Sequence, residues 1–272
     1  MNKIAFIGAG SMAEAIVSGI INKQVIKQEN VWVTNKDNKD RLIEMKEKYG
    51  VSTSQDKAKV LSEAEIIVLS TKPYDMEDAI ESIVPYISEN QLIMSVVAGI
   101  STDQITRASR KNMPVIRAMP NTSASIGYSA TAITQGEFAS SKDMSLAKKL
   151  FEAIGTVNIV AEKDMHIVTA ISGSGPAYIY YLVEAMQEAA QKEGLDAITA
   201  KELITQTIIG AGKMLDTSEL PVNVLRENVT SPNGTTEAGL KALAEHNFTE
   251  AVVECVTSAT NRSKELGKSK TK

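Results

Sequence analysis

A glycine-rich turn lies near the start of the 272-residue chain, between the apolar run Ile4 to Ile7 and a helical segment that begins at Ser11. In a strand, turn and helix of this kind the first glycine permits the tight turn, and the second lets a backbone approach a pyrophosphate. The helix start also attracts phosphate. A packing turn without a ligand is the alternative. The turn favours a dinucleotide site with these candidate residues: Ile7, Gly8, Gly10, Ser11 and Met12.

The residues after the second predicted strand indicate the type of cofactor. In NAD-binding domains an acidic side chain at this place commonly binds the ribose 2′-hydroxyl. This chain has Thr34, Asn35 and Lys36 there, and a cation beside neutral polar groups suits a 2′-phosphate. The sequence therefore predicts NADPH as the preferred cofactor over NADH, although Asp37 lies close by. The alternative is a helix start capped by Asn35.

Two further strand ends fall at the same edge, because parallel strands present ligands at their carboxyl ends. Thr71, Lys72 and Pro73 follow the third predicted strand and place a cation and a rigid turn beside the expected cofactor groove. Lys72 is equally compatible with a solvated loop. The fourth predicted strand ends in the small residues Ala98 and Gly99, which leave room for a cofactor.

A second stretch suited to binding runs from Asn228 to Leu240, where a Ser-Pro-Asn-Gly turn precedes a predicted helix. Free N–H groups at a helix start, with hydroxyls beside them, can hold a carboxylate without an arginine. Spacing alone favours an ordinary capped helix start, which needs only one hydroxyl. The accumulation of hydroxyls suggests an anion site instead, with these candidate residues: Asn228, Val229, Ser231, Asn233, Gly234, Thr235 and Thr236.

Two kinds of apolar periodicity indicate the strands and helices that carry the candidate residues. In the first part of the chain apolar strands alternate with amphipathic helices, which is typical of a parallel sheet covered on both faces. The strands predicted after the first are Val31 to Asn35, Ile66 to Ser70, Gln91 to Val97, Val115 to Ala118, Ser129 to Ile133 and Val157 to Val160. The helices predicted between them are Asn38 to Tyr49, Asp75 to Ile87, Thr102 to Ser109 and Ser141 to Ala153.

After about Lys163 the apolar residues recur at helical spacing only. The predicted helices there are Met165 to Glu193, Ile198 to Leu215, Val222 to Val229 and Glu250 to Leu266. The sequence thus predicts an α/β chain with a Rossmann-type dinucleotide-binding domain at residues 1–162 and an all-helical domain at residues 163–272. Small residues in the helical domain would allow it to pack closely on itself or on a second copy.

Composition excludes several classes of function. A net charge of −4 gives no basic field for nucleic acid. Cys255 is the single cysteine and His166 and His246 are the only histidines, so neither a disulfide nor a metal site is expected. No apolar run approaches the roughly 20 residues that span a bilayer, and no signal peptide precedes the first strand. We expect a cytoplasmic protein without a nucleic-acid or membrane partner.

Five motifs together resemble the pyrroline-5-carboxylate reductases, the NAD(P)H-dependent enzymes of the last step of proline synthesis. The resemblance covers nearly the whole chain. Three motifs lie in the first domain and two in the helical domain: Ile7 to Ala13, Thr71 to Pro73, Arg117 to Thr122, Ser172 to Tyr178 and Thr230 to Gly239. The resemblance implies hydride transfer to the C=N carbon of 1-pyrroline-5-carboxylate, and it places Asn121 at the cofactor.

The resemblance also implies roles for the last motif. In the family this stretch binds the substrate carboxylate through backbone N–H groups, and the position matching Thr236 places a hydroxyl near the imine nitrogen. Family members in which helices of two subunits interlock around each active site imply a homodimer at least. A protonated cyclic imine is already an electrophile, so a positioned hydride donor and at most a hydroxyl or water suffice, which agrees with the lack of a strong acid in these motifs.

Three residues depart from the commonest family pattern. Ser123 stands where proline is usual, and Asn233 replaces the first of two glycines, but we expect both turns to survive. Asp56 stands where asparagine is common, and we do not count it as a cofactor ligand because an extra negative charge there would cost affinity unless paired.

Two other functions remain open at this point. A hydroxy acid dehydrogenase of similar architecture would carry a catalytic lysine near the start of its helical domain, yet no lysine occurs between Lys163 and Lys192. A non-enzymatic NAD(P)-binding regulator is compatible with the fold, but the retention of Ser231, Gly234 and Thr236 argues against it.

Overall fold

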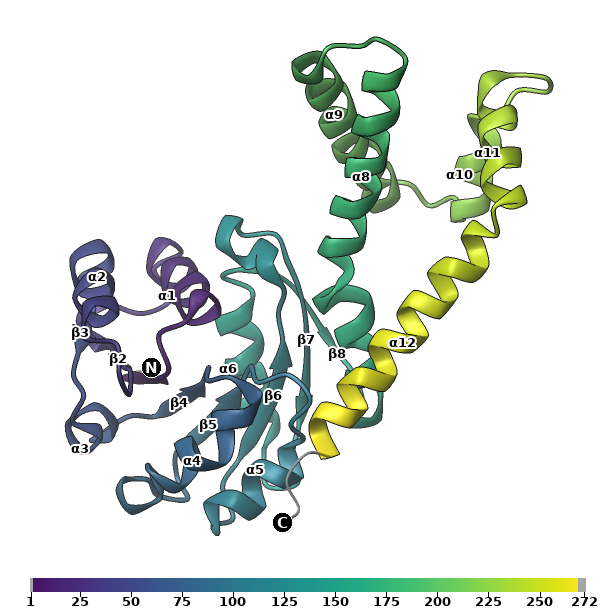
Figure 1. Cartoon of the computed structure of the whole chain (residues 1–272). Coiled ribbons are helices and arrows are strands. Elements are labelled where there is room, and N and C mark those ends of the chain that lie inside the picture. Colours follow the sequence, from purple (N-terminus) through teal and green to yellow (C-terminus); the bar gives the residue numbers. More distant parts are fainter. Residues whose placement is uncertain (1, 269–272) are drawn as a thin grey trace. The chain divides into compact units, whose positions relative to one another are not determined.

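The computed structural model describes residues 2–268, which contain an eight-stranded sheet followed by helices (Figure 1). The strand order is β3-β2-β1-β4-β5-β6-β7-β8, and every neighbouring pair is parallel except β6 and β7, which are antiparallel. The strands are β1 Ile4–Ile7, β2 Val31–Thr34, β3 Ser52–Thr53, β4 Ile66–Leu69, β5 Leu92–Ser95, β6 Val115–Met119, β7 Ser129–Gln135 and β8 Gly155–Ile159.

The helices alternate with the strands up to β8 and then continue alone. Those between the strands are α1 Ser11–Asn22, α2 Lys39–Tyr49, α3 Lys57–Leu61, α4 Met76–Glu81, α5 Thr102–Ser109 and α6 Ser141–Phe151. Those after β8 are α7 Met165–Val168, a π-turn at Thr169–Gly173, α8 Gly175–Lys192, α9 Ala197–Thr217, α10 Val222–Asn228, α11 Thr235–Glu245 and α12 Phe248–Lys268. The predicted class, a Rossmann-type α/β domain followed by an all-helical one, is confirmed for the described part of the chain.

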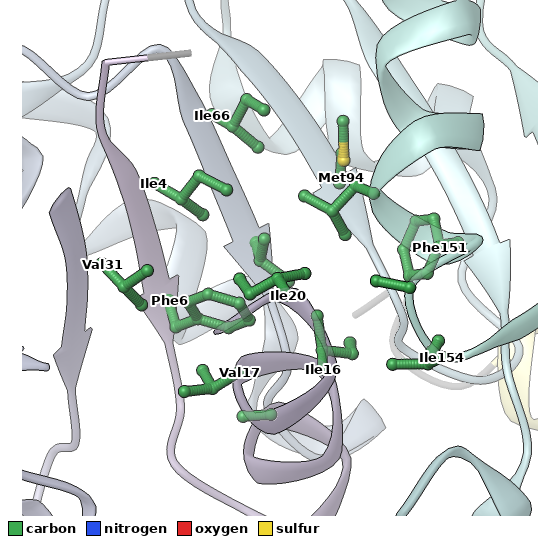
Figure 2. Close-up of a cluster of buried hydrophobic side chains, with 14 of the residues drawn as sticks. Ile4, Phe6, Ile16, Val17, Ile20, Val31, Ile66, Met94, Phe151 and Ile154 are labelled. Atoms are coloured by element: carbon green, nitrogen blue, oxygen red, sulfur yellow. The ribbon is translucent and has the colours of Figure 1, made fainter. Parts of the chain in front are cut away.

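The central strands are buried on both faces, which explains why they read as continuous apolar runs. Phe6 of β1 points into a cluster that it shares with α1, α2 and α6 and that also contains Ile16, Ile20 and Phe151 (Figure 2). Ile7 of the same strand belongs to a second cluster, which α3, α4 and α5 cover. This double cover fixes the register of the strands, and with it the edge at which their carboxyl ends meet.

The structure differs from the sequence prediction where local chemistry interrupts a pattern. The helix predicted over Asp75 to Ile87 ends at Glu81, and Pro85 lies in a separate short turn because proline cannot continue the helical hydrogen bonds. The helix predicted from Met165 is divided by the π-turn at Thr169–Gly173. Neither β3 nor α3 was predicted, because two and five residues carry too little periodicity. The antiparallel direction of β7 was not predicted either.

The described residues form two compact units, one of residues 2–176 with 257–268 and one of residues 177–256. The end of α12 therefore belongs to the first unit. Ser263 is buried and its Oγ lies 3.0 Å from Nδ1 of His166, while the Gln104 side chain donates to the Gly267 carbonyl at 2.7 Å. The predicted domain limits, 1–162 and 163–272, remain a prediction, and their first and last residues fall outside the described range. Among the helices of residues 2–268, none combines the length and the apolar composition that a membrane span requires.

Candidate cofactor and substrate sites

The glycine turn after β1 has the backbone geometry that a close-fitting turn requires. Gly8 adopts a φ of 109°, and a Cβ on it would lie 2.7 Å from the carbonyl oxygen of Ser70. Any side chain at this position would therefore clash with the end of β4. Gly10, by contrast, has open space around its Cα, and a Cβ on it would meet no atom within 4 Å. The first glycine thus lets the strands approach each other, and the second leaves a surface that a ligand can reach.

The start of α1 carries N–H groups that no side chain caps. Gly10 is the N-cap residue, and within the described residues no side-chain hydrogen bond is made at this cap. The preceding carbonyl, that of Ala9, accepts a hydrogen bond from Nε of Arg41 at 2.8 Å, which holds the turn in place. Ser11 is exposed, and Met12 packs against the apolar cluster of α1. An uncapped helix start beside open backbone is the arrangement that favours a phosphate.

Arg41 belongs to a charged cluster that the sequence analysis missed. Its guanidinium pairs with Glu14 of α1, whose carboxylate also accepts from Lys48 at 2.8 Å and from the Tyr49 hydroxyl at 2.7 Å. The hydrogen bonds from Lys48 and Arg41 lower the pKa of Glu14 to about 2. The cluster neutralises an acidic side chain close to the expected phosphates. No spacing rule reveals it, because Glu14 and Arg41 lie on different helices.

Acid should weaken this cluster. Because the folded protein depresses the pKa of Glu14, its contribution to stability is complete above the ordinary value of 4.5 and is lost as the pH falls from there toward about 2. Glu14→Gln should flatten the decline of melting temperature over that pH range. Melting curves of both proteins from neutral pH to the acid limit measure this, with Glu188→Gln as a matched control for an exposed ion pair on α8. If the melting temperatures of Glu14→Gln and the wild type fall equally steeply with decreasing pH, the depressed pKa of Glu14 does not contribute to stability.

After β2 the chain continues with Asn35, which is half-buried, and Lys36, which is exposed, and neither carries a carboxylate. The side-chain oxygen of Asn35 accepts from the N–H groups of Asp37 and Asn38 at 3.2 Å, and Lys36 is exposed. The helix cap proposed as the alternative role of Asn35 is instead made by Asn38, which accepts from the N–H of Arg41 at 2.9 Å. Asp56 caps α3 by accepting from the N–H of Ala58, so its charge has a structural role.

The end of β4 holds a buried hydroxyl without a partner. Among residues 2–268 the Oγ1 atom of Thr71 makes no hydrogen bond although it is shielded from solvent. A buried polar atom of this kind is costly unless a ligand or water satisfies it. Lys72 is exposed, with its Nζ 5.6 Å from the centroid of the Tyr74 ring, and Pro73 begins a short turn that leads to α4. Thr71 is thus the residue here whose environment most clearly calls for a ligand.

The ends of β5 and β6 are partly occupied by other segments of the first unit. Gly99 has a φ of 81° and is buried against α12, where a Cβ on it would lie 3.1 Å from the Cβ of Leu266. Ala98 beside it is half-buried. Asn121 is 8% exposed, and its amide donates to the carbonyl of Ser172 at 3.0 Å and accepts from the N–H of Ser123 at 3.1 Å. Both polar atoms of this side chain therefore have partners within the protein.

In the second unit the predicted anion-binding stretch forms the turn between α10 and α11. Gly234 is the N-cap residue of α11, without a side-chain cap, and Thr235 and Thr236 are the first two helical residues. Asn233 adopts a φ of 58°, which asparagine tolerates well and which explains how it replaces a glycine. Its N–H donates to the Glu237 carboxylate at 2.6 Å. Within residues 2–268 no side chain, whether of Ser231, Thr235 or Thr236, caps this helix start.

The remaining substrate candidates lie around the same turn. Asn228 is the last residue of α10, and Val229, its C-cap residue, is 66% exposed. A groove within the second unit follows the turn and is lined by residues of α10, α11 and the start of α12, including Thr230, Gly234 and Phe248. The structure thus gathers the cofactor candidates at the carboxyl edge of the sheet and the substrate candidates at one helix start. Each set is coherent within its own unit.

Known proteins share this arrangement over its whole length. Pyrroline-5-carboxylate reductase 2 of Bacillus subtilis is 47% identical over 266 residues, which is 98% of this chain and 95% of that protein. The chain belongs to the pyrroline-5-carboxylate reductase family. The family model for pyrroline-5-carboxylate reductase dimerisation matches residues 162–266, and a model described as NADP oxidoreductase coenzyme F420-dependent matches residues 3–99.

Two solved structures of the family superpose closely. The pyrroline-5-carboxylate reductase of Coxiella burnetii is 38% identical, with a TM-score of 0.90 over 98% of this chain and 99% of that one. The Plasmodium falciparum enzyme, solved with NADP bound, is 30% identical, with a TM-score of 0.89 over 97% and 98% of the two chains. Both likenesses extend through the sheet and the helices that follow it.

Proposed function

We propose that this protein reduces 1-pyrroline-5-carboxylate to L-proline with NADPH, or less readily NADH, as the last step of proline biosynthesis. The observation that carries the proposal is full-length membership of the pyrroline-5-carboxylate reductase family, with 47% identity to the Bacillus subtilis protein. Two features of the chain add support. They are the uncapped helix start at Gly10 and the second uncapped helix start at Gly234.

The residues at the carboxyl edge of the sheet fit a dinucleotide. Gly8 and Gly10 leave the backbone open, the start of α1 suits the pyrophosphate, and the buried Thr71 hydroxyl lacks a partner among the described residues. Asn35 and Lys36 would hold the 2′-phosphate, while Lys72, Pro73 and Ala98 would line the rest of the groove. Gly99, which is buried against α12, would shape the backbone beside it. When bound, NADPH supplies the hydride that reduces the C=N carbon.

The chain's task at the substrate is to hold and orient it. The free N–H groups at the start of α11, those of Thr235 and Thr236, would bind the substrate carboxylate. Ser231, Asn233 and Gly234 would shape the turn, in which the Gly234 N–H donates to the Ser231 carbonyl at 3.0 Å, and Asn228 and Val229 would lie at its other side. Thr236 would place its hydroxyl near the imine nitrogen, where it can donate a hydrogen bond or pass on a proton. Fixing the ring in this way can account for roughly 7 to 11 kcal/mol of a reaction barrier.

The test is direct. Purified protein with NADPH should lose absorbance at the wavelength of the reduced nicotinamide only after 1-pyrroline-5-carboxylate is added, and proline should accumulate in equal amount. NADPH binding without turnover would favour the regulator, and turnover of a 2- or 3-hydroxy acid with the oxidised cofactor would favour the dehydrogenase. Either result would overturn the proposed activity. We propose a cytoplasmic location as well, in keeping with a chain whose single cysteine, Cys255, is exposed and unpaired.

Cofactor preference should depend on Lys36. NADPH should give the higher kcat/KM, because the exposed Lys36 can pair with a 2′-phosphate and no carboxylate precedes it after β2. Lys36→Asp should lower the ratio of kcat/KM for NADPH to that for NADH, and Lys39→Asp, at the start of α2, is the control for a general change of charge. An unchanged ratio in Lys36→Asp would remove this residue from the 2′-phosphate site.

The second unit exposes many apolar side chains that another subunit could cover. The chain matches a dimerisation family model, which supports an oligomer. Between residues 177 and 256 only Ala200 and Ile204 among the apolar residues are buried, whereas large apolar side chains such as Tyr181, Ile198 and Val222 are 77%, 73% and 68% exposed. Exposed apolar area of this extent is typical of an interface. We propose a homodimer at least, in which the helices of two subunits interlock around each active site.

Light scattering checks the oligomer. We expect the active protein to elute as a dimer or a larger assembly, and Ile198→Asp on α9 should shift it toward smaller species. Ile43→Asp, on an exposed site of α2 in the first unit, is the matched control. An active species at the mass of one chain, 29.3 kDa, would contradict the proposal.

A further inference from the structure

The carbonyl of Ser172 lies at a point where the helix cannot satisfy it in the usual way. In an α-helix this oxygen would accept from the N–H four residues later, and that residue is Pro176, which has no N–H. The backbone adapts by forming the π-turn at Thr169–Gly173, in which the N–H of Ser174 donates to the Thr169 carbonyl at 2.9 Å. A donor from elsewhere can then reach the Ser172 carbonyl.

Asn121 supplies that donor. Its Nδ2 lies 3.0 Å from the Ser172 carbonyl oxygen, across 51 residues of sequence. The orientation of the amide is fixed, because the backbone N–H of Ser123 donates to Oδ1 at 3.1 Å and the Ser172 carbonyl can only accept. Ser123 is one of the departures from the usual family pattern. A proline there would have no N–H to orient the Asn121 amide.

The strand side of this link is itself held firmly. The backbone N–H of Asn121 donates to the buried Oγ of Ser129 at 3.1 Å, and that hydroxyl lies 2.9 Å from the buried Oγ1 of Thr131 on the same strand, β7. The π-turn also fits tightly against the end of β6, since a Cβ on Gly173 would lie 3.0 Å from the Cε of Met119. Asn121 thus joins two parts of the first unit that are already in contact.

We infer that Asn121 is a positioning residue for the reduction rather than a ligand of the cofactor. The carboxyl end of β6 lies at the edge of the sheet where a dinucleotide binds in folds of this kind. Through its amide, Asn121 fixes the segment from Ser172 to Gly175 beside that edge. Both polar atoms of the amide already have partners within the protein, so its position is set without the nicotinamide. This inference rests on the proposed reductase function for its kinetic consequence.

Asn121→Asp isolates the link. Aspartate still accepts from the N–H of Ser123, and so keeps the start of the short turn at Thr122–Ile126, but it has no N–H to donate to Ser172. Gln91→Glu is a matched control at the amino end of β5, where the buried Gln91 amide donates to the Ala64 carbonyl at 2.7 Å and accepts from the N–H of Ser88 at 2.8 Å. Both substitutions replace a buried amide with a carboxyl group, and only one touches the π-turn.

Two measurements test the inference. In the free protein, amide hydrogen exchange of residues 169–175 should become faster in Asn121→Asp and remain unchanged in Gln91→Glu. In steady-state assays, Asn121→Asp should lower kcat for 1-pyrroline-5-carboxylate by roughly 10- to 100-fold, the cost of a small misplacement near a reacting centre, while the Kd for NADPH stays near that of the wild type. Gln91→Glu should keep the kcat of its folded fraction.

Asn121→Ser serves if the aspartate variant does not fold, because serine also caps the turn but is too short to reach Ser172. A weakened Kd for NADPH with an unchanged kcat would make Asn121 a cofactor ligand and overturn the inference. Unchanged exchange in residues 169–175 would overturn it too. A wild-type protein inactive on the substrate would instead refute the proposed function, while the exchange measurement would still decide whether the link exists.

Discussion

Thr236→Ala is expected to lower both kcat and kcat/KM for 1-pyrroline-5-carboxylate by on the order of 10²-fold, the loss typical of a proton-transfer partner. In the free chain the Thr236 hydroxyl has no structural role at the helix start. Thr236 is the second residue of α11, it is exposed, and Gly234 is the N-cap, so the hydroxyl is not needed to start the helix. Steady-state kinetics with both constants measure the effect.

Thr235→Ala is the matched control, because Thr235 is the adjacent hydroxyl at the same helix start. It should change kcat much less than Thr236→Ala. Since neither hydroxyl caps the helix, both variants should keep the melting temperature near that of the wild type, where loss of a cap would cost about 1 kcal/mol. If Thr236→Ala retains near-normal kcat, the imine must receive its proton from solvent or bind already protonated.

The largest loss of stability is expected from Glu162→Gln. Arg117 of β6 is 1% exposed, and its Nη1 lies 2.6 Å from a Glu162 oxygen, while the Thr102 hydroxyl donates to the other oxygen at 3.0 Å. Nε and Nη2 of Arg117 are buried without a partner among the described residues, so Glu162 provides all the compensation that its charge receives there. Removing the carboxylate should lower the free energy of unfolding by about 3 kcal/mol.

Arg117→Met is the informative comparison. This substitution removes the buried charge that Glu162 compensates, so it should lower the free energy of unfolding less than Glu162→Gln does. The double variant should be no less stable than Glu162→Gln alone. Urea unfolding midpoints at a single protein concentration compare the three, since the stability of an oligomer depends on concentration. A loss in Glu162→Gln no larger than in Glu152→Gln, which breaks an exposed pair with Lys148 of α6, would contradict this account.

The sequence was a good guide wherever a short motif or a long period carried the information. The turn was predicted from its two glycines, and at Gly8 the positive φ and the nearby Ser70 carbonyl do exclude a side chain. The order of strands and helices followed from apolar runs that are buried on both faces. Arg117 and Glu162 are different, since they lie 45 residues apart and neither spacing nor composition pairs them. The link between Asn121 and Ser172 could not be predicted either. It exists because Pro176 has no N–H, which leaves the Ser172 carbonyl without its usual helical donor.

The predicted sites divide in the same way. The substrate candidates from Ser231 to Thr236 form one continuous turn, so the sequence could locate them together. The cofactor candidates come from the ends of several strands, and sequence could group them only through the rule for parallel sheets. Their individual surroundings, such as the buried Thr71 hydroxyl and the exposed Lys72, depend on tertiary packing that no local pattern encodes.

The return of α12 to the first unit has a consequence for how the protein is made. Ser263 and Gly267 cover His166, Gln104 and Gly99, yet a ribosome produces them only after the whole second unit, residues 177–256, has emerged. Domains generally fold in order of synthesis. Here the nascent sheet must wait for the last turns of α12 before that part of its surface is covered. The growing chain therefore carries an incomplete first domain while the helical unit is translated, which is when a chaperone would have most to bind.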